Sequence, residues 1–248
     1  MDAKSVKVSV ITVTFNSEKT LAKTIESVLN QTYDKVEYII MDGNSKDATV
    51  EIAEEYKERF AAKGYELKIV SEPDRGMYDA LNKGVDLATG DIIGQINSDD
   101  WYEPIALETA ANKFMDNSFD LFWADLRIIK PSGNMIKKAK IANFVTSRHW
   151  NHPTTFIRAE VYKNNPYSLI SMYDDFELIL RLRKQGVKMA VENKVLANFV
   201  FGGMSTQKDF KDTMRRIKLS CNNYKINGYG LPYFIDRVVI EMAKFILG

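Results

Sequence analysis

The stretch VSVITVTFNSEKTLAKTIESVLNQTY, residues 8–33, decides the fold class. The run from Val6 to Thr14 is rich in β-branched residues, which predicts a buried strand. Apolar residues at helical spacing follow it, and they are Leu21, Ile25, Val28 and Leu29. This spacing predicts an amphipathic helix directly after the strand, which is the start of a βαβ unit.

The same alternation continues through residue 114. Strands are predicted at 36–41, 67–70 and 91–96, and apolar stripes predict helices around 52–60, 78–85 and 107–114. Each crossover between parallel strands must lay a helix back on the sheet. The first half of the chain is therefore expected to be α/β, with a mostly parallel sheet covered by helices on both faces.

The pattern changes beyond Phe119. DLFWADLRII (120–129) and MIKKA (135–139) flank the turn sequence Pro131–Asn134, which predicts a hairpin and a small β insertion. Further elements are a helix over 174–185 ended by Gly186, a strand over 187–191, and two C-terminal helices, one over 208–225 and one from about Pro232.

The charge and composition of the chain limit which partners and which cellular location can be expected. The chain has 34 Lys and Arg against 33 Asp and Glu, so no net field attracts polyanions, and nucleic acid is not an expected partner. A single cysteine, Cys221, cannot form an internal disulfide, and the N-terminal residues lack the apolar core of a signal peptide. We therefore expect a cytoplasmic location, with contact to the inner face of the membrane as an open alternative.

Polar residues follow each strand of the first half, where ligands of open α/β sheets bind. In chain order these residues are Thr14, Asn16, Asp42, Glu72, Asp74, Arg75, Asn97, Ser98, Asp99 and Asp100, with Lys83 nearby. Taken singly, each also fits a turn or a helix cap. Adjacent carboxylates repel unless a cation compensates them, so Asp99 and Asp100 favour a site for Mg²⁺ or Mn²⁺.

Four segments together resemble the nucleotide-binding half of family 2 glycosyltransferases with the GT-A fold. They are residues 8–33, EYIIMDGNSKDAT (37–49), SEPDRGMYDALNKG (71–84) and GDIIGQINSDDWY (90–102). The resemblance covers about residues 5–205. It implies an inverting enzyme that moves a sugar from a nucleotide donor, UDP before GDP or dTDP, to a hydroxyl of a saccharide or lipid-linked saccharide. It also implies a catalytic domain over 1–205, divided near 103 into a nucleotide-binding and an acceptor-side half, followed by a helical extension over 206–248.

The resemblance assigns roles to the polar residues at the strand ends. Thr14 and Asn16 would line the nucleoside pocket, Asp42 would accept the pyrimidine imide hydrogen, and Arg75 with Lys83 would lie near the base and phosphates. Asn97, Ser98 and Asp100 would belong to the nucleotide site, with Asp99 as the metal ligand. Asn97 departs from the family's usual aspartate and brings no negative charge, so Asp99 carries most of the metal assignment. Asp100 would either ligate the metal or bond the ribose.

The segment YDDFELILRL (173–182) resembles the family's acidic pair at the start of a helix, with Asp175 at the position of the general base. Inverting transfer needs one carboxylate to remove the acceptor hydroxyl's proton. Capping of the helix is the alternative role for Asp174 and Asp175. Asp174 and His152 are assigned to the acceptor or diphosphate, although a buried structural role for His152 is as well supported. Residues 202–205 resemble a loop that closes over donor phosphates, or form only a turn.

Other classes of function remain to be weighed. A nucleotide-sugar-binding subunit or sensor without catalysis is the main alternative, and Asn97 is its best support. A nucleotidyltransferase would need a glycine-rich loop after the first strand, and TFNSEKT (14–20) has none. GxGxxG and GxxxxGK[ST] are absent from the sequence, which excludes the common dinucleotide and P-loop sites. The last helix, about 231–247, is amphipathic, and we expect it to pack on its own domain or in a homodimer, with peripheral membrane contact as the alternative.

Overall fold

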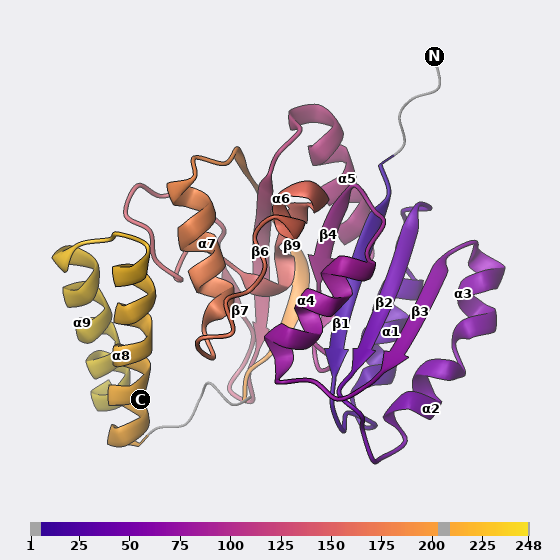
Figure 1. Cartoon of the computed structure of the whole chain (residues 1–248), viewed down its shortest axis with the longest axis horizontal. Helices are drawn as coiled ribbons and strands as arrows, with labels where there is room; N and C mark the ends of the chain where they lie inside the picture. The colour runs from indigo at the N-terminus through magenta and orange to yellow at the C-terminus, as the bar shows by residue number, and fades with distance from the viewer. Residues whose placement is uncertain (1–5, 203–208, 248) are drawn as a thin grey trace.

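The computed structural model describes residues 6–202 and 209–247 (Figure 1). The alternation predicted for the first half is confirmed by the elements β1 (Val8–Thr14), α1 (Leu21–Leu29), β2 (Val36–Asp42), β3 (Glu66–Ser71), α4 (Met77–Leu87), β4 (Ile92–Gln95) and α5 (Ala106–Asn117). The helix predicted over 52–60 is two helices, α2 (Thr49–Glu54) and α3 (Lys57–Lys63). Its apolar stripe survives the break, since Ala53 and Phe60 are both buried.

The described strands form one mixed sheet in the order β3-β2-β1-β4-β8-β6-β9-β5, where β5 is Trp101–Tyr102, and β7 pairs with β6. The first four strands in this order run parallel. The in-register residues Thr14, Asp42 and Ser71 end β1, β2 and β3 at the same level. The polar residues that follow these strands therefore meet at one edge of the sheet, as the sequence predicts.

The second half of the chain completes this sheet. The predicted hairpin exists as β6 (Leu121–Ile129) and β7 (Met135–Lys137). However, β6 also pairs with β8 (Phe156–Arg158) and with β9 (Met189–Val200), so it is a central strand and not part of a separate insertion. Its first six residues are all buried, which explains this position. The strand predicted over 187–191 is the start of β9.

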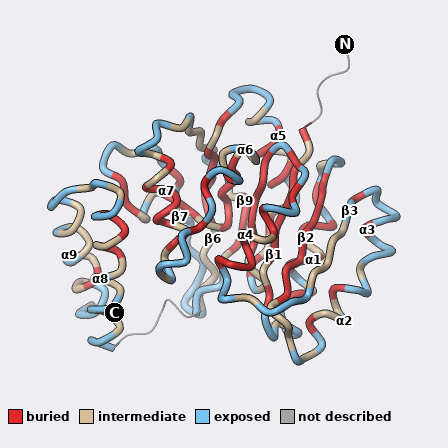
Figure 2. Tube along the Cα trace, viewed as in Figure 1, coloured by how far each residue is buried: buried red, intermediate tan, exposed pale blue. Residues whose placement is uncertain are grey.

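Helices cover both faces of the sheet, as predicted (Figure 1). One core joins the strands to α1, α3 and α5 through Ile25, Phe60 and Leu107. The other core joins them to α4, α6 (Ala159–Lys163) and α7 (Asp174–Lys184) through Leu81, Tyr162 and Leu180. The strands lie between these layers, and the central strands β1, β2 and β4 are buried almost throughout (Figure 2).

Two antiparallel helices, α8 (Phe210–Ile226) and α9 (Leu231–Leu247), lie at the end of the molecule opposite β3 (Figure 1). The Tyr224 hydroxyl donates to the Val145 carbonyl at 2.9 Å, and the rings of Phe144 and Tyr233 stack at 4.4 Å. These contacts attach the pair to the loop that follows β7. Residues 203–205 of the predicted phosphate loop, and the expected boundary at 205, lie outside the described residues.

Candidate active site

The ends of β1 and β2 are joined by a hydrogen-bond network around Asp42. This carboxylate is buried and accepts hydrogen bonds from Ser71 Oγ at 2.6 Å, from the Ser45 amide at 2.9 Å, and from the Ser45 hydroxyl. Its neighbour in the sheet, Thr14, has a buried Oγ1 with no hydrogen-bond partner among the described residues. A buried hydroxyl without a partner is costly unless a ligand or water satisfies it, so Thr14 fits a binding role.

Asn16 holds the loop after β1 against the loop after β2. Its side-chain Oδ1 accepts from the backbone amide of Lys46 at 2.9 Å, and its backbone amide donates to Ser45 Oγ at 2.8 Å. The backbone of Asn16 has φ 49°, a left-handed conformation that asparagine tolerates better than most residues. The side chain of Asn16 therefore shapes the predicted nucleoside pocket through the backbone of the adjacent loop.

Arg75 and Lys83 form ion pairs along one side of α4. The Arg75 guanidinium lies 2.7 Å from Asp79, and the Lys83 ammonium lies 2.7 Å from Glu72. The Arg75 side chain is 77% exposed, whereas that of Asp79 is 10% exposed. The structure brings these cations to the end of β3, but it does not join them to Asp42 or Asp99 by any described contact.

The segment Asn97–Asp100 forms a tight turn after β4. The Asp100 amide donates to the Asn97 carbonyl at 3.1 Å, and Asn97 Nδ2 donates to Asp100 Oδ2 at 3.3 Å. Asp100 is fully buried and also accepts from the Val200 amide at 3.0 Å. Burial, and secondly the charge of Asp99, raise the pKa of Asp100 to about 8. Ser98 Oγ lies 2.9 Å from Ser17 Oγ, which ties this turn to the loop after β1.

Asp99 is exposed, and its carboxylate forms no hydrogen bond or ion pair with another described residue. Partial desolvation raises the pKa of Asp99, which reflects the lack of a compensating cation. In the described part of the chain, no three His, Cys, Asp or Glu side chains lie close enough to hold a metal ion by themselves. A cation at Asp99 would need most of its ligands from phosphate and water, which is how Mg²⁺ commonly binds with nucleotides.

The predicted base, Asp175, lies beside His152. Asp175 Oδ2 is 3.3 Å from His152 Nδ1, and the two side chains are 22% and 12% exposed. The same Nδ1 lies 3.5 Å from Nε2 of Gln95, at the end of β4. The contact series Asp175–His152–Gln95 therefore links the start of α7 to the strand that leads into Asp99.

Two buried tyrosines hold the side chain of Gln95 in place through hydrogen bonds. Its Oε1 accepts from Tyr162 Oη at 3.1 Å, its Nε2 donates to Tyr167 Oη at 2.8 Å, and Tyr167 Oη can donate to Tyr162 Oη at 2.6 Å. Our sequence analysis missed Gln95. The signal was present, because Gln95 is the one polar side chain in the buried run IIGQI (92–96).

Lys137 on β7 is a second residue that sequence reasoning missed. Its Nζ donates to the Trp150 carbonyl at 2.7 Å. Burial lowers the pKa of Lys137 to about 8, and the nearby charge of Asp175 opposes this shift. No pattern in MIKKA distinguishes Lys137 from Lys138, so only the tertiary structure reveals that this ammonium lies near Asp175.

Asp174 binds the loop that precedes α7 and not the amides of the helix itself, so its side chain does not cap α7. It is fully buried and accepts from the amides of Ile170 and Ser171, each at 2.8 Å. Both carboxylate oxygens are therefore occupied within the loop that precedes α7. Glu177 pairs with Arg181, one turn further along α7, at 3.2 Å.

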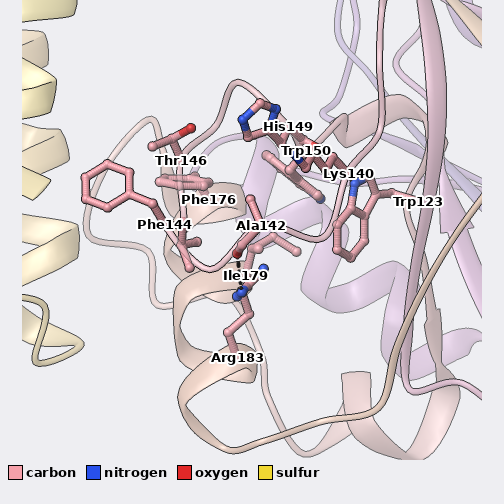
Figure 3. Close-up of a pocket in the computed structure, with 11 residues that line it drawn as sticks. Trp123, Lys140, Ala142, Phe144, Thr146, His149, Trp150, Phe176, Ile179 and Arg183 are labelled. Atoms are coloured by element: carbon pink, nitrogen blue, oxygen red, sulfur yellow. Dashed lines mark hydrogen bonds between the residues drawn. The ribbon is translucent and has the colours of Figure 1, made fainter.

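Figure 3 shows a pocket between the loop after β7 and α7. Trp150 and Phe176 line it, together with Trp123, Phe144 and Ile179, and Arg183 bonds the Ala142 carbonyl at 2.7 Å on its far side. None of the predicted site residues lines this pocket. It adjoins the site through Trp150, whose ring packs edge-on against His152 at 5.9 Å.

Comparison with known proteins identifies the family. The sequence model described as "Glycosyl transferase family 2" matches residues 9–175, which contain all the residues discussed above from Thr14 to Asp175. The chain belongs to this family. The resemblance inferred from the sequence is thereby confirmed, and so is the glycosyltransferase class.

Two chondroitin synthases are similar over nearly the whole of this chain and are much longer than it. A chondroitin synthase of Pasteurella multocida is 26% identical over 254 residues, covering 96% of this chain and 25% of the relative. A chondroitin synthase of Escherichia coli is 27% identical, covering 92% of this chain and 34% of the relative. The putative glycosyltransferase EpsH of Bacillus subtilis is 38% identical over 39% of this chain and 27% of its own length. This chain thus spans about a quarter to a third of these relatives.

Solved structures share the fold. TarS 1–349 of S. aureus in complex with UDP-GlcNAc matches with a TM-score of 0.70 and 19% identity, over 97% of this chain and 73% of that chain. The mannosyltransferase PcManGT of Pyrobaculum calidifontis, in complex with GDP-Man and Mn²⁺, matches with a TM-score of 0.66 and 17% identity, over 98% and 70%. The expected GT-A architecture is confirmed, with a mixed sheet.

Proposed function

We propose that this chain is an inverting, metal-dependent glycosyltransferase that moves a sugar from a UDP-sugar to a hydroxyl of a saccharide or lipid-linked saccharide. The observation that carries the proposal is the contact series Asp175–His152–Gln95, because it brings a carboxylate base to the strand that leads into Asp99. Retention of Asp99, Asp100 and Asp175 favours catalysis over a binding subunit or sensor without chemistry.

The donor site would be formed by the edge of the sheet. Asp42 would accept the imide hydrogen of uracil, with Thr14 and Asn16 around the nucleoside, and Ser98 and Asp100 near the ribose. Arg75 would turn from the buried Asp79, and Lys83 from the exposed Glu72, toward the phosphates. PcManGT and TarS, of the same fold, were solved with a nucleotide sugar.

The residues present fit a Mn²⁺ or Mg²⁺ ion held at Asp99. Asp99 is exposed and unpaired within the described part of the chain, Asn97 offers an amide oxygen, and the donor diphosphate would supply further oxygen ligands. The ion would neutralise charge that develops on the leaving nucleoside diphosphate.

Asp175 would act as the general base. Its carboxylate would remove the proton of the acceptor hydroxyl as that oxygen attacks the anomeric carbon, while the bond to the diphosphate breaks on the opposite face. His152 would orient Asp175 by donating Nδ1–H to its carboxylate, and Gln95 would pack against the same edge of the imidazole ring. Asp174 would keep the loop before α7 in place through its two backbone hydrogen bonds.

We also propose that catalysis resides in residues 1–205, with the nucleotide-binding half ending near 103 and with 206–248 as a helical extension. The enzyme would work in the cytoplasm, where nucleotide sugars are the donors. Hydrolysis of a panel of nucleotide sugars in the presence of Mn²⁺ would identify the nucleotide and the sugar.

Thermal unfolding with UDP and Mn²⁺ tests the donor site. We expect UDP and Mn²⁺ together to raise the Tm by about 5 °C at saturation, because the ligand binds only the folded state. Asp99→Asn should abolish this shift. Asp86→Asn, a matched change at an exposed position on α4, should retain it. An equal shift in both variants would contradict the metal assignment, and no shift in the wild type would contradict the donor site.

A further inference from the structure

Helix α9 carries its apolar side chains outward. Leu231, Ile235, Val239 and Ile246 are 65%, 55%, 59% and 72% exposed. Their spacing of four, four and seven residues puts them on one face of the helix, which we call the outer face of α9. Val238 and Phe245 flank this face and are also exposed. A soluble helix normally turns such a stripe toward the core, so this orientation needs an explanation.

The side of α9 that faces the protein carries charged side chains beside the aromatic Tyr233 and Phe234. Glu241 is almost fully buried and pairs with Arg216 at 2.9 Å and with Arg237 at 2.9 Å. Asp236 pairs with Arg148 at 2.8 Å. These ion pairs orient the helix, and breaking a buried one would leave an uncompensated charge. These ion pairs therefore keep the apolar stripe of α9 directed toward solvent.

Helix α8 places basic residues beside this apolar surface. The rings of Phe210 and Phe245 meet edge to face at 5.8 Å, so the start of α8 lies against the end of α9. The exposed Lys and Arg residues of α8 that form no ion pair among the described residues are Lys211, Arg215, Lys218 and Lys225. The acidic residues of the two helices are Asp212, Asp236 and Glu241, and none of them is exposed. The surface of α8 and α9 is thus apolar and basic.

We propose that α8 and α9 form a docking surface for an anionic lipid bilayer. The outer face of α9 would enter the boundary between headgroups and acyl chains, and the cations of α8 would contact acidic headgroups. No helix in the described part of the chain is long and apolar enough to cross a membrane, so the contact is peripheral. A second copy of this chain fits the surface less well, because two sets of unpaired cations would face each other. The proposal does not depend on the proposed function.

Co-sedimentation with lipid vesicles tests the docking surface. We expect the chain to bind vesicles of phosphatidylcholine containing about one third phosphatidylglycerol, and to bind phosphatidylcholine alone at least about tenfold more weakly. Two variants should each weaken binding to the anionic vesicles by about tenfold or more, one lacking apolar groups (Ile235→Ser with Val239→Ser) and one lacking charge (Lys211→Gln, Arg215→Gln and Lys218→Gln).

Matched changes elsewhere on the surface serve as controls. Leu87→Ser with Met115→Ser removes two apolar groups that are 40% and 47% exposed, and Lys35→Gln, Lys57→Gln and Lys194→Gln remove as much charge from other faces. Both controls should bind anionic vesicles like the wild type. Equal binding to neutral and anionic vesicles, or equal loss in the controls, would overturn the proposal. The proposal would also be overturned if the chain did not bind vesicles and instead formed a dimer in light scattering. In that case, Ile235→Ser with Val239→Ser would abolish the dimer.

Discussion

Four aspartates of the candidate site differ in environment, and each difference suits a different role. Asp42 is buried and saturated with hydrogen bonds, so it can present a fixed acceptor. Asp99 is exposed and unpaired among the described residues, which suits a metal ligand. Asp100 is buried with a pKa raised to about 8, so its negative charge is costly unless a cation lies nearby. Asp175 contacts His152, which can orient it.

The buried carboxylate of Glu37, on β2, allows a test of how stability depends on pH. Burial alone would raise its pKa, but hydrogen bonds from Lys68, Ser9 and Thr89 outweigh this and lower the pKa to about 2. The ionised form therefore stabilises the fold at any pH above the unfolded pKa of 4.5, and this contribution is lost as the pH falls toward 2. The lost contribution should be about 3 kcal/mol.

Urea unfolding at a series of pH values would measure this loss. Glu37→Gln should lower the free energy of unfolding at pH 7 and flatten its decline in acid, because the titrating group is gone. Glu66→Gln, at the exposed partner of Lys7, should leave the decline unchanged. Parallel pH profiles for the wild type and Glu37→Gln would show that this carboxylate is not the titrating group.

At the residue scale, sequence reasoning found the polar groups that follow strands and missed those within them. Thr14, Asp42 and Asp99 follow predicted strands, and the structure brings their segments to one edge. Gln95 lies inside β4, and Lys137 lies on β7, so neither was singled out. The local sequence pattern predicts which residues end a strand. It does not predict which side chains lie near Asp175, because that depends on how distant segments pack together.

At the scale of elements, the network of Gln95, Tyr162 and Tyr167 joins β4 to α6 and to the loop before α7. Its hydroxyls are buried and bond one another, so the network is rigid and costly to break. Because Gln95 contacts His152, this network transmits the position of β4 to the start of α7. We infer that it orients Asp175 relative to the donor site.

Tyr167→Phe tests this orienting role. Loss of the hydroxyl should reduce kcat for transfer about tenfold and leave UDP binding unchanged, because Gln95 loses one of its anchors while the donor edge of the sheet stays intact. Tyr38→Phe is the matched control, since its buried hydroxyl bonds Thr12 at 2.9 Å in the opposite core. Both variants should lose about 1 kcal/mol of stability. An equal loss of kcat in both would assign the effect to stability and not to orientation.

The elements of the first half could be predicted because their information is local. Each parallel strand is followed by its own crossover helix, and the apolar stripes of α1, α4 and α5 identify them directly. The position of β6 could not be predicted in this way. Its hairpin with β7 is local, but its pairing with β9 joins residues more than sixty positions apart. The pattern of apolar residues in a segment predicts that it is a strand, but it does not predict which strands pair with it.

At the scale of the whole molecule, one sheet carries both halves of the candidate site. The parallel strands β3, β2, β1 and β4 present the donor residues, and β8 joins them to β6 and β9 of the second half. Asp175 approaches from α7, which covers one face of this sheet. The helices α8 and α9 lie at the end of the molecule opposite β3 (Figure 1). Contact of these helices with a bilayer would therefore leave the donor residues at the ends of β1 and β2 away from the lipid.

The division of work between donor binding and proton removal is tested most directly by Asp175→Asn. Transfer from a UDP-sugar would be measured beside the Tm shift given by UDP and Mn²⁺ for the same preparation. The account predicts that the Tm shift is retained while kcat falls about a hundredfold or more, because only the base is lost. Undiminished transfer by Asp175→Asn would contradict it.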